Sequence, residues 1–293
     1  MTTLRPRRSV LYMPGSNARA LEKARTLPAD ALILDLEDAV APDAKELARQ
    51  QVCAAVEARG FGKREIIIRV NALSTPWGEA DLAAAAAAKP DAILVPKISS
   101  PKDLHSVEEH LLRDHADRAI TVWAMVETPI AILNVGAIAA AGGRLSCFVM
   151  GTNDLIKEIH GNHTPDRANL SAALGLSVLA ARANAIAVID GVYNDIQNAD
   201  GFKAACEQAR SFGFDGKTLI HPSQIEPCNA VFAPSAEDVE AARKLIAAFA
   251  LPENKGKGAI KLDGRMVELL HAEIARATVA MADAIAALEQ DDR

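Results

Sequence analysis

Short apolar runs alternate with helix-like stretches along most of the chain. Eight runs, each four or five residues long, end in polar or charged residues and are separated by stretches with helical spacing of apolar positions. They cover residues 10–13, 31–34, 65–68, 92–95, 122–126, 147–150, 185–189 and 217–220. The runs are nearly continuous rather than alternating, which is typical of strands buried on both faces of a parallel sheet.

This alternation predicts the fold. Eight strand–helix units in about 225 residues fit a (β/α)8 TIM barrel better than an open doubly wound sheet. No G-x-G-x-x-G follows the first run, so the strongest indication of a dinucleotide-binding fold is absent. We expect an α/β barrel catalytic domain over residues 1–229 and a C-terminal helical extension with a lid segment over residues 230–293.

Composition and charge exclude several classes of protein. With 293 residues, of which 50% are hydrophobic, the chain is long enough for one full core. The net charge of −6 and the lack of a basic stripe argue against a nucleic-acid partner. No apolar run is long enough to cross a membrane, and the four widely spaced cysteines indicate reduced thiols of a cytoplasmic protein.

Charged and polar residues close nearly every apolar run. In a (β/α)8 barrel the carboxyl ends of the strands meet at one mouth, where the active site lies. The residues that we expect there are Asp35, Glu37, Asp38, Arg69, Asn71, Lys97, Glu127, Asp154, Asp190 and His221. Because Arg69 and Lys97 would face several acids, these cations must be paired with them or bind a charged ligand if they are buried.

Two of these carboxylates follow consecutive strands. Glu127 ends the fifth run and Asp154 lies just past the sixth, so both emerge at the same edge of a parallel sheet. Side by side they repel each other unless a proton or a cation lies between them, and oxygen ligands suit a hard ion such as Mg²⁺. The pair therefore predicts a magnesium site, and the alternative is that each acid only caps the segment that follows it.

Several segments, in order along the chain, resemble one family. They are RSVLYMPG from Arg8, DLEDAV from Asp35, RVN from Arg69, VPK from Val95, VET from Val126, GTNDL from Gly151 and GFDGKTLIHPSQI from Gly213. Together they resemble the citrate lyase beta subunit family of the HpcH/HpaI aldolase superfamily, which includes malyl-CoA and citramalyl-CoA lyases and malyl-CoA thioesterases. The resemblance implies a (β/α)8 barrel, magnesium, and a CoA thioester that is cleaved or formed next to a carbonyl.

The resemblance also implies roles for residues of the mouth. Glu127 and Asp154 would be the magnesium ligands, and Glu127 would also face the substrate. Arg69 would bind the substrate carboxylate or the thioester oxygen, which suits the planar fork of a guanidinium. An ion pair of Arg69 with Glu37 or Asp35 is the structural alternative, although both roles can hold together.

Three acids and one cation complete the expected site. Asp35, Glu37 and Asp38 are assigned to a supporting shell that orients Arg69. Lys97 either pairs with one of these acids or contacts the substrate.

The coenzyme A partner is expected near the first two strands. A Pro-Gly-Ser-Asn loop opens a helix that carries Arg19 and Lys23 on its early turns, and a helix N-terminus with nearby cations suits phosphate. In the resembled family, the nucleotide end of CoA lies along this side. The alternative is an ordinary helix cap with solvated basic residues.

The last part of the chain predicts a lid. A helix with Ser235 as its N-cap is followed by a polar, glycine-containing stretch over residues 252–258 and a short apolar run that includes Asp263. Asp263-Gly264 alone reads as a turn. The resemblance of GAIKLDGRMV to the family's C-terminal segment implies instead that Asp263 is a mobile catalytic acid/base that reaches a neighbouring subunit. It also implies a homo-oligomer, either a trimer or a dimer of trimers.

The main functional interpretation is a Mg²⁺-dependent carbon–carbon lyase. It would split a 3-hydroxyacyl-CoA such as malyl-, methylmalyl-, citramalyl- or citryl-CoA by a retro-Claisen reaction. The alternatives are a malyl-CoA thioesterase and an accessory citrate lyase beta subunit that acts with an acyl carrier protein. His160, His163 and His221 are candidates for proton transfer, but a structural role is favoured for each. The segment over residues 156–160 departs from relatives that cleave citryl or citramalyl thioesters and leaves the acyl group open.

Overall fold

The computed structural model describes residues 5–291, and the chain divides into two compact units. The first unit is Arg7–Phe232, and the second combines residues 5–6 with the residues from Ala233 onward. The predicted roles of the two parts as catalytic domain and lid stay predictions. Among residues 5–291, no helix is both long and apolar enough to span a bilayer.

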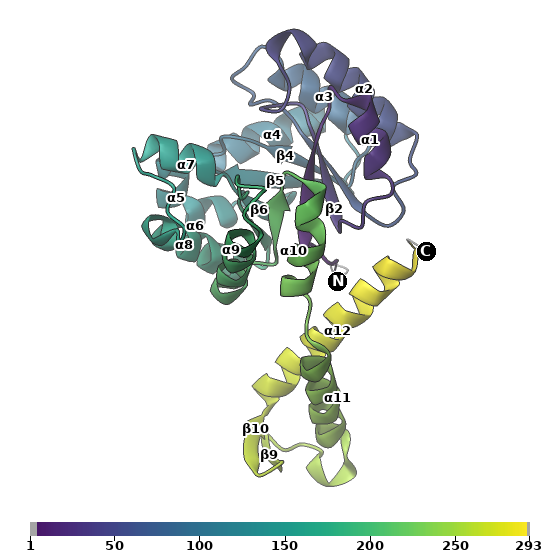
Figure 1. The fold of residues 1–293 in the computed structure, drawn as a ribbon, viewed down its shortest axis with the longest axis vertical. Helices are drawn as coiled ribbons and strands as arrows, with labels where there is room; N and C mark the ends of the chain where they lie inside the picture. Colours follow the sequence, from purple (N-terminus) through teal and green to yellow (C-terminus); the bar gives the residue numbers. More distant parts are fainter. Residues whose placement is uncertain (1–4, 292–293) are drawn as a thin grey trace. The chain divides into compact units, whose positions relative to one another are not determined.

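The first unit is a closed barrel of eight parallel strands, as the apolar runs predict (Figure 1). The strands lie in sequence order, and β1 pairs with β8 to close the barrel. They are β1 (Ser9–Pro14), β2 (Ala31–Asp35), β3 (Glu65–Arg69), β4 (Ala92–Val95), β5 (Thr121–Val126), β6 (Leu145–Met150), β7 (Ala187–Asp190) and β8 (Gly216–Leu219). The TIM-barrel prediction is therefore confirmed.

Helices connect the strands. The main ones are α1 (Ala18–Ala24), α2 (Lys45–Glu57), α3 (Gly78–Ala88), α4 (Pro101–Arg113), α5 (Pro129–Leu133), α6 (Val135–Ala139), α7 (Thr152–Glu158), α8 (Ser171–Ala183), α9 (Ala199–Phe212) and α10 (Ile225–Phe232). Three short 3₁₀ turns precede α2, α8 and α10, namely η1 (Pro42–Ala44), η2 (Ala168–Leu170) and η3 (Pro222–Gln224).

One predicted helix is divided in two. The sequence predicts a single helix between the fifth and sixth strands, but α5 ends at Leu133 and α6 begins at Val135. The residue between them, Asn134, has non-helical backbone angles, and its side-chain amide donates to the Ser99 carbonyl at 2.9 Å. The polar side chain thus bonds outside the helix and interrupts it.

Two apolar cores determine which strand residues point toward the mouth of the barrel. One lies inside the barrel and includes Val10, Ile33, Ile67 and Met125, and the other lies between the sheet and the helices. Because successive strand residues face opposite sides, the residue two positions after an inward apolar residue also faces inward. The inward rows therefore end in polar residues at the mouth, namely Tyr12, Asp35, Arg69 and Glu127.

The second unit is a pair of helices with a hairpin. It contains α11 (Ala236–Ala250), the turn η4 (Pro252–Asn254), strands β9 (Ala259–Leu262) and β10 (Arg265–Glu268), and α12 (Leu269–Asp291). The two strands are antiparallel, and Leu262 pairs with Arg265, so Asp263 and Gly264 form a two-residue turn. Both turn residues have positive φ angles of 50° and 79°. An Asp-Gly pair suits this type of hairpin turn.

Candidate active site

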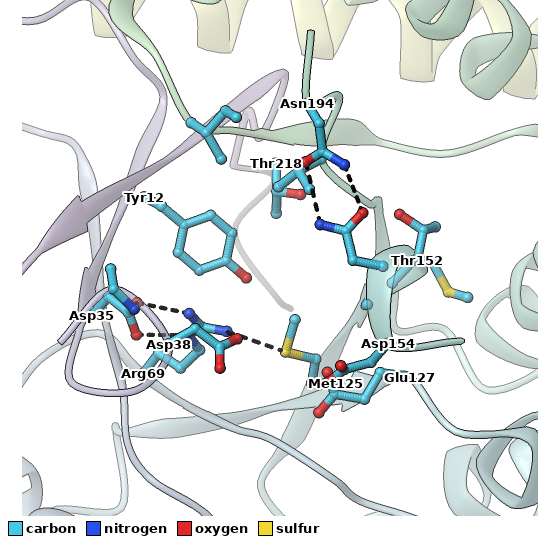
Figure 2. A pocket seen from close by; sticks show the side chains of 16 residues that line it. Tyr12, Asp35, Asp38, Arg69, Met125, Glu127, Thr152, Asp154, Asn194 and Thr218 are labelled. Carbon is cyan, nitrogen blue, oxygen red and sulfur yellow. Dashed lines mark hydrogen bonds and ion pairs between the residues drawn. The ribbon is translucent and has the colours of Figure 1, made fainter. Parts of the chain in front are cut away.

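A pocket opens at the carboxyl ends of the strands, where barrel enzymes hold their active sites (Figure 2). Its volume is about 320 Å³. The residues that line it include Tyr12, Asp35, Asp38, Arg69, Met125, Glu127, Gly151, Thr152, Asn153, Asp154, Asn194 and Thr218. Five of the ten strand-end residues that the sequence predicts for the mouth line this pocket, namely Asp35, Asp38, Arg69, Glu127 and Asp154.

Arg69 lies at the centre of an acidic cluster. The Asp35 carboxylate accepts hydrogen bonds from Arg69 Nε at 2.6 Å and from Arg69 Nη2 at 2.7 Å. Nη1 lies 2.8 Å from Glu37 Oε2 and 3.2 Å from Asp38 Oδ2. With only 5% of its surface exposed, Arg69 is a buried cation whose guanidinium nitrogens all face acids at the end of β2 and in the loop after it. The predicted supporting acids do surround Arg69.

The loop that carries these acids is anchored from behind. Asp35 also accepts hydrogen bonds from two backbone amides of the loop, at 2.9 and 3.0 Å. The ammonium of Lys45, on α2, donates to the carbonyls of Leu36 and Glu37 and to the Asn71 side chain, at 2.7–2.9 Å. Sequence reasoning missed Lys45, because a lysine on an amphipathic helix usually faces solvent. These bonds fix the acids in place before any ligand binds.

Burial changes the protonation of two groups near Arg69. Burial raises the pKa of Glu37 to about 8; neighbouring acids add to this effect, and Arg69 opposes it. Burial also raises the pKa of Tyr12, so its phenol keeps its proton at neutral pH. The mouth therefore holds fewer negative charges than its number of acids indicates.

Glu127 and Asp154 share a cation, which is the Lys97 ammonium. The Lys97 backbone amide donates to Glu127 Oε1 at 2.8 Å, and Nζ lies 3.7 Å from the same oxygen. Nζ also forms an ion pair with Asp154 Oδ2. Burial raises the pKa of Glu127 to about 7, against the effect of Lys97. Burial alone would raise the pKa of Asp154, but the hydrogen bond and charge of Lys97 outweigh it and lower that pKa.

The two carboxylates fit a magnesium ion. The Lys97 ammonium lies where a metal cation would lie between the two carboxylates. Carboxylate oxygens are the ligands that Mg²⁺ prefers. Gly151 lies against Glu127, and a Cβ at this position would overlap the Glu127 side chain, so only glycine leaves the carboxylate in place. Within residues 5–291, no group of three or more His, Cys, Asp and Glu side chains is arranged so that it could hold a metal ion. The donors suit an ion that keeps several waters and takes one or two protein carboxylates.

Another strand-end acid, Asp190, is neutralised within the barrel. It is fully buried, and its carboxylate lies 2.6 Å from Lys217 Nζ and 2.7 Å from Arg167 Nη1. Lys217 is fully buried as well. These contacts tie β7 to β8 and make Asp190 part of the scaffold below the mouth.

The predicted CoA contacts and histidines lie outside the pocket. Arg19 and Lys23 are exposed on α1 and do not line it. His160 and His163 are exposed too. His221 is also exposed, and its Nδ1 lies 2.8 Å from Ser223 Oγ, which is a local turn contact.

Asp263 lies in the second unit, at the tip of the β9–β10 hairpin. Its carboxylate forms an ion pair with Lys244 at 2.7 Å, and its side chain is 65% exposed. Its predicted catalytic role stays a prediction.

Sequence reasoning did not assign roles to several uncharged residues of the pocket. Tyr12, Met125, Thr152 and Thr218 line it, and the side-chain amides of Asn153 and Asn194 bond each other at its rim, at 2.8 and 3.2 Å. The signal that finds Tyr12 is its position two residues after Val10, which makes it an inward residue of β1 once the barrel is known.

Comparison with known proteins identifies relatives over nearly the whole chain. A (3S)-malyl-CoA thioesterase of Cereibacter sphaeroides is 52% identical over 282 residues, which is 96% of each chain. Citrate lyase subunit beta of Escherichia coli is 34% identical over 269 residues, covering 90% of this chain and 89% of that one. A crystal structure of protein CitE from Mycobacterium tuberculosis, in complex with magnesium, acetoacetate and coenzyme A, matches with a TM-score of 0.74. It is 26% identical and covers 97% of this chain and all of that chain.

These relatives correct the main functional prediction. The expectation of a carbon–carbon lyase is wrong, because the relatives at 52% identity are thioesterases, which are hydrolases. The error has a physical reason: paired carboxylates, a metal and an arginine can stabilise negative charge on a thioester oxygen in either reaction. The family motifs therefore do not distinguish the two, and the thioesterase alternative is the better supported.

The profile of the HpcH/HpaI aldolase/citrate lyase family matches residues 8–222, which span all eight strands of the barrel. The chain is a member of the HpcH/HpaI aldolase/citrate lyase family.

Proposed function

We propose that the chain is a magnesium-dependent thioesterase that hydrolyses a 3-hydroxyacyl-CoA of the malyl type to the free hydroxy acid and CoA. The observation that carries the proposal is the 52% identity, over 96% of both chains, with (3S)-malyl-CoA thioesterases. Similarity to citrate lyase subunit beta is lower, at 34% identity, and gives less support to an accessory role with a carrier protein.

Glu127 and Asp154 are the proposed magnesium ligands. Two observations support this assignment. The Lys97 ammonium lies between the two carboxylates, and the related CitE structure contains magnesium. When bound, the ion would supply positive charge that polarises substrate oxygens. When the ion binds, the Lys97 ammonium would be displaced from between the carboxylates, and Lys97 would become available to the substrate.

The remaining residues of the mouth hold and shape the site. Asp35 and Lys45 fix Arg69 and the acidic loop, so the pocket keeps its form without a ligand. A pocket of about 320 Å³ is large enough for the four-carbon acyl part of malyl-CoA. A buried, preorganised wall of this kind lowers the reorganisation needed when charge develops on the thioester.

Two further assignments rest on the family resemblance. We propose that Asp263 supplies a proton-transfer carboxylate to the active site of a neighbouring subunit in a trimer or dimer of trimers. Arg19 and Lys23, both exposed, are proposed contacts for the phosphates of CoA. Asp263→Ala and Arg19→Ala test these roles separately, because the first should lower kcat and the second should raise KM for the CoA ester.

Product analysis tests the proposed function. The metal-stripped protein is given (3S)-malyl-CoA with and without Mg²⁺, thiol release is followed, and the products are identified by mass spectrometry. We expect malate and free CoA only when Mg²⁺ is present, and no release by Glu127→Gln. Acetyl-CoA with glyoxylate, or no turnover together with a stable carrier-protein complex, would overturn the proposal.

A further inference from the structure

The ring of Tyr12 packs on Arg69 at the mouth, but within residues 5–291 its hydroxyl has no hydrogen-bond partner. Tyr12 lines the pocket from β1, and its ring lies over the guanidinium of Arg69, with 4.8 Å between Cζ and the ring centroid. Asp35 holds that guanidinium at two nitrogens. The tyrosine ring therefore packs on a fixed plane, and its hydroxyl has a defined position.

The Tyr12 hydroxyl is buried and unsatisfied. Among the described residues that line the pocket, it is the one buried side-chain polar atom without a hydrogen-bond partner. A buried donor without a partner is unfavourable, so such a group in a folded protein requires an explanation, and a hydrogen bond to a bound ligand is one. Figure 2 shows the hydroxyl directed into the pocket. Because burial keeps the phenol protonated, the site presents a neutral hydrogen-bond donor to whatever binds there.

The charge around Arg69 decides which ligand group suits this donor. Asp35, Glu37 and Asp38 all face one guanidinium. Even with Glu37 protonated, the two negative charges of Asp35 and Asp38 exceed the single positive charge of Arg69, so this side of the pocket does not attract a carboxylate. A neutral carbonyl oxygen, which accepts a hydrogen bond without adding charge, suits the Tyr12 hydroxyl better.

The opposite side of the pocket suits the hydroxy-acid end. Figure 2 shows Tyr12 and Arg69 on one side, and Glu127 with Asp154 on the other. A substrate whose hydroxyl and carboxylate approach a cation at Glu127 and Asp154 extends its thioester toward Tyr12. The two sides of the pocket thus match the two ends of a 3-hydroxyacyl thioester.

We infer that the Tyr12 hydroxyl donates a hydrogen bond to the thioester carbonyl oxygen and to the oxyanion that develops there, an inference that rests on the proposed hydrolysis. In that reaction the water oxygen bonds to the carbonyl carbon. The carbon–sulfur bond then breaks, and its electron pair leaves with the CoA sulfur, which receives a proton from the water. Tyr12 keeps its own proton and acts only as a donor to the oxygen.

Tyr12→Phe isolates this hydroxyl, because the ring that packs on Arg69 stays. Removing one oxyanion donor lowers kcat by about 100-fold in comparable sites, and we expect that loss with Mg²⁺ affinity and the circular dichroism spectrum unchanged. The matched control is Tyr193→Phe, since Tyr193 packs against Phe202 with 6.0 Å between ring centroids and does not line the pocket. A Tyr12→Phe enzyme with the kcat of the wild type, or with only KM raised, would overturn the inference.

Binding of two analogues that cannot be hydrolysed tests whether the Tyr12 hydroxyl bonds the carbonyl oxygen, without any turnover. A ketone analogue of malyl-CoA has a methylene in place of the thioester sulfur, and a thioether analogue has a methylene in place of the carbonyl. Tyr12→Phe should weaken the ketone about 10-fold, the effect of one hydrogen bond, and leave the thioether within about 2-fold. Equal changes for both analogues would mean that Tyr12 only shapes the pocket.

The two experiments separate this inference from the proposed function. If the wild-type protein does not hydrolyse malyl-CoA, the proposed function fails, and Tyr12 loses its role in that reaction. If the wild type hydrolyses the thioester while Tyr12→Phe matches it in rate and in ketone binding, only the assignment of Tyr12 fails.

Discussion

The barrel mouth and the β9–β10 hairpin carry the same types of charged side chain in opposite surroundings. At the mouth, Asp35 and Arg69 are almost fully buried, and their ion pair is bidentate. At the hairpin tip, Asp263 and Lys244 form a single contact at 2.7 Å, with side chains 65% and 58% exposed. Burial thus makes the mouth rigid and electrostatically strong, whereas solvent screens the hairpin pair and leaves its carboxylate free to change partners.

This contrast predicts where a single substitution has a large effect. At the mouth each charge is held by others, so removal of one leaves a buried charge uncompensated. At the hairpin, water replaces a lost partner. Substitutions at the mouth are therefore expected to have larger effects than substitutions at the hairpin.

The largest effect is expected from Glu127→Gln or Asp154→Asn. Each removes one of two carboxylates that face the same cation, and loss of several kcal/mol of charge stabilisation lowers the rate at least about 100-fold. Mg²⁺ affinity, measured by calorimetric titration, should fall with the rate. Unchanged metal affinity in both variants would remove the pair from the metal site.

Asp35→Ala should strongly destabilise the barrel. Breaking a buried ion pair leaves Arg69 without its bidentate partner, at a cost of about 3 kcal/mol in the free energy of unfolding. Urea denaturation followed by circular dichroism measures it. A change below about 1 kcal/mol would mean that Glu37 and Asp38 replace Asp35.

Lys97→Met should strengthen Mg²⁺ binding about 10-fold, because it removes the cation that competes for the two carboxylates. Titration without substrate isolates this effect from any contact between Lys97 and the thioester. The surface variant Lys89→Met is the control, since it removes an exposed lysine at the end of α3. Weaker or equal binding in Lys97→Met would show that Lys97 supports the site rather than competing for it.

The pKa of Glu37 predicts a pH-dependent stability. Its pKa is about 8 in the folded protein against an ordinary 4.5, so the folded state binds this proton more tightly than the unfolded chain. Stability from this group is therefore present at low pH and is lost as the pH rises toward 8. Relative to wild type, Glu37→Gln should gain about 1–2 kcal/mol between about pH 5 and pH 8 in metal-free buffer. A pH-independent difference would contradict the assigned pKa.

The smallest effect on stability is expected at the hairpin. Asp263→Ala removes an exposed ion pair, which contributes less than about 1 kcal/mol to stability. Thermal denaturation beside Asp35→Ala tests the contrast between the two regions directly. A destabilisation as large as that of Asp35→Ala would mean that the hairpin carboxylate is buried in the working protein.

The sequence was sufficient to predict the barrel and four charged residues of its mouth. All eight apolar runs lie within two residues of the observed strands, because strands buried on both faces need near-continuous apolar residues. Asp35, Arg69, Glu127 and Asp154 could be assigned to the mouth because they close those runs.

Other features depend on three-dimensional contacts that no local pattern encodes. Lys45 has the spacing of a surface lysine but donates three bonds beneath the acidic loop. Tyr12 lies within an apolar run, and its unsatisfied hydroxyl is visible only in the folded pocket. The break at Asn134 comes from a bond to Ser99, which lies 35 residues away. The reaction type was missed because one set of motifs serves both cleavage and hydrolysis.

The central claim is that this site adds water to a thioester. The most direct measurement is hydrolysis of (3S)-malyl-CoA in ¹⁸O-labelled water with Mg²⁺, followed by mass spectrometry of the acyl product. We expect malate with one ¹⁸O in the carboxylate that was the thioester, together with free CoA. Acetyl-CoA and glyoxylate as products, without labelled malate, would contradict it.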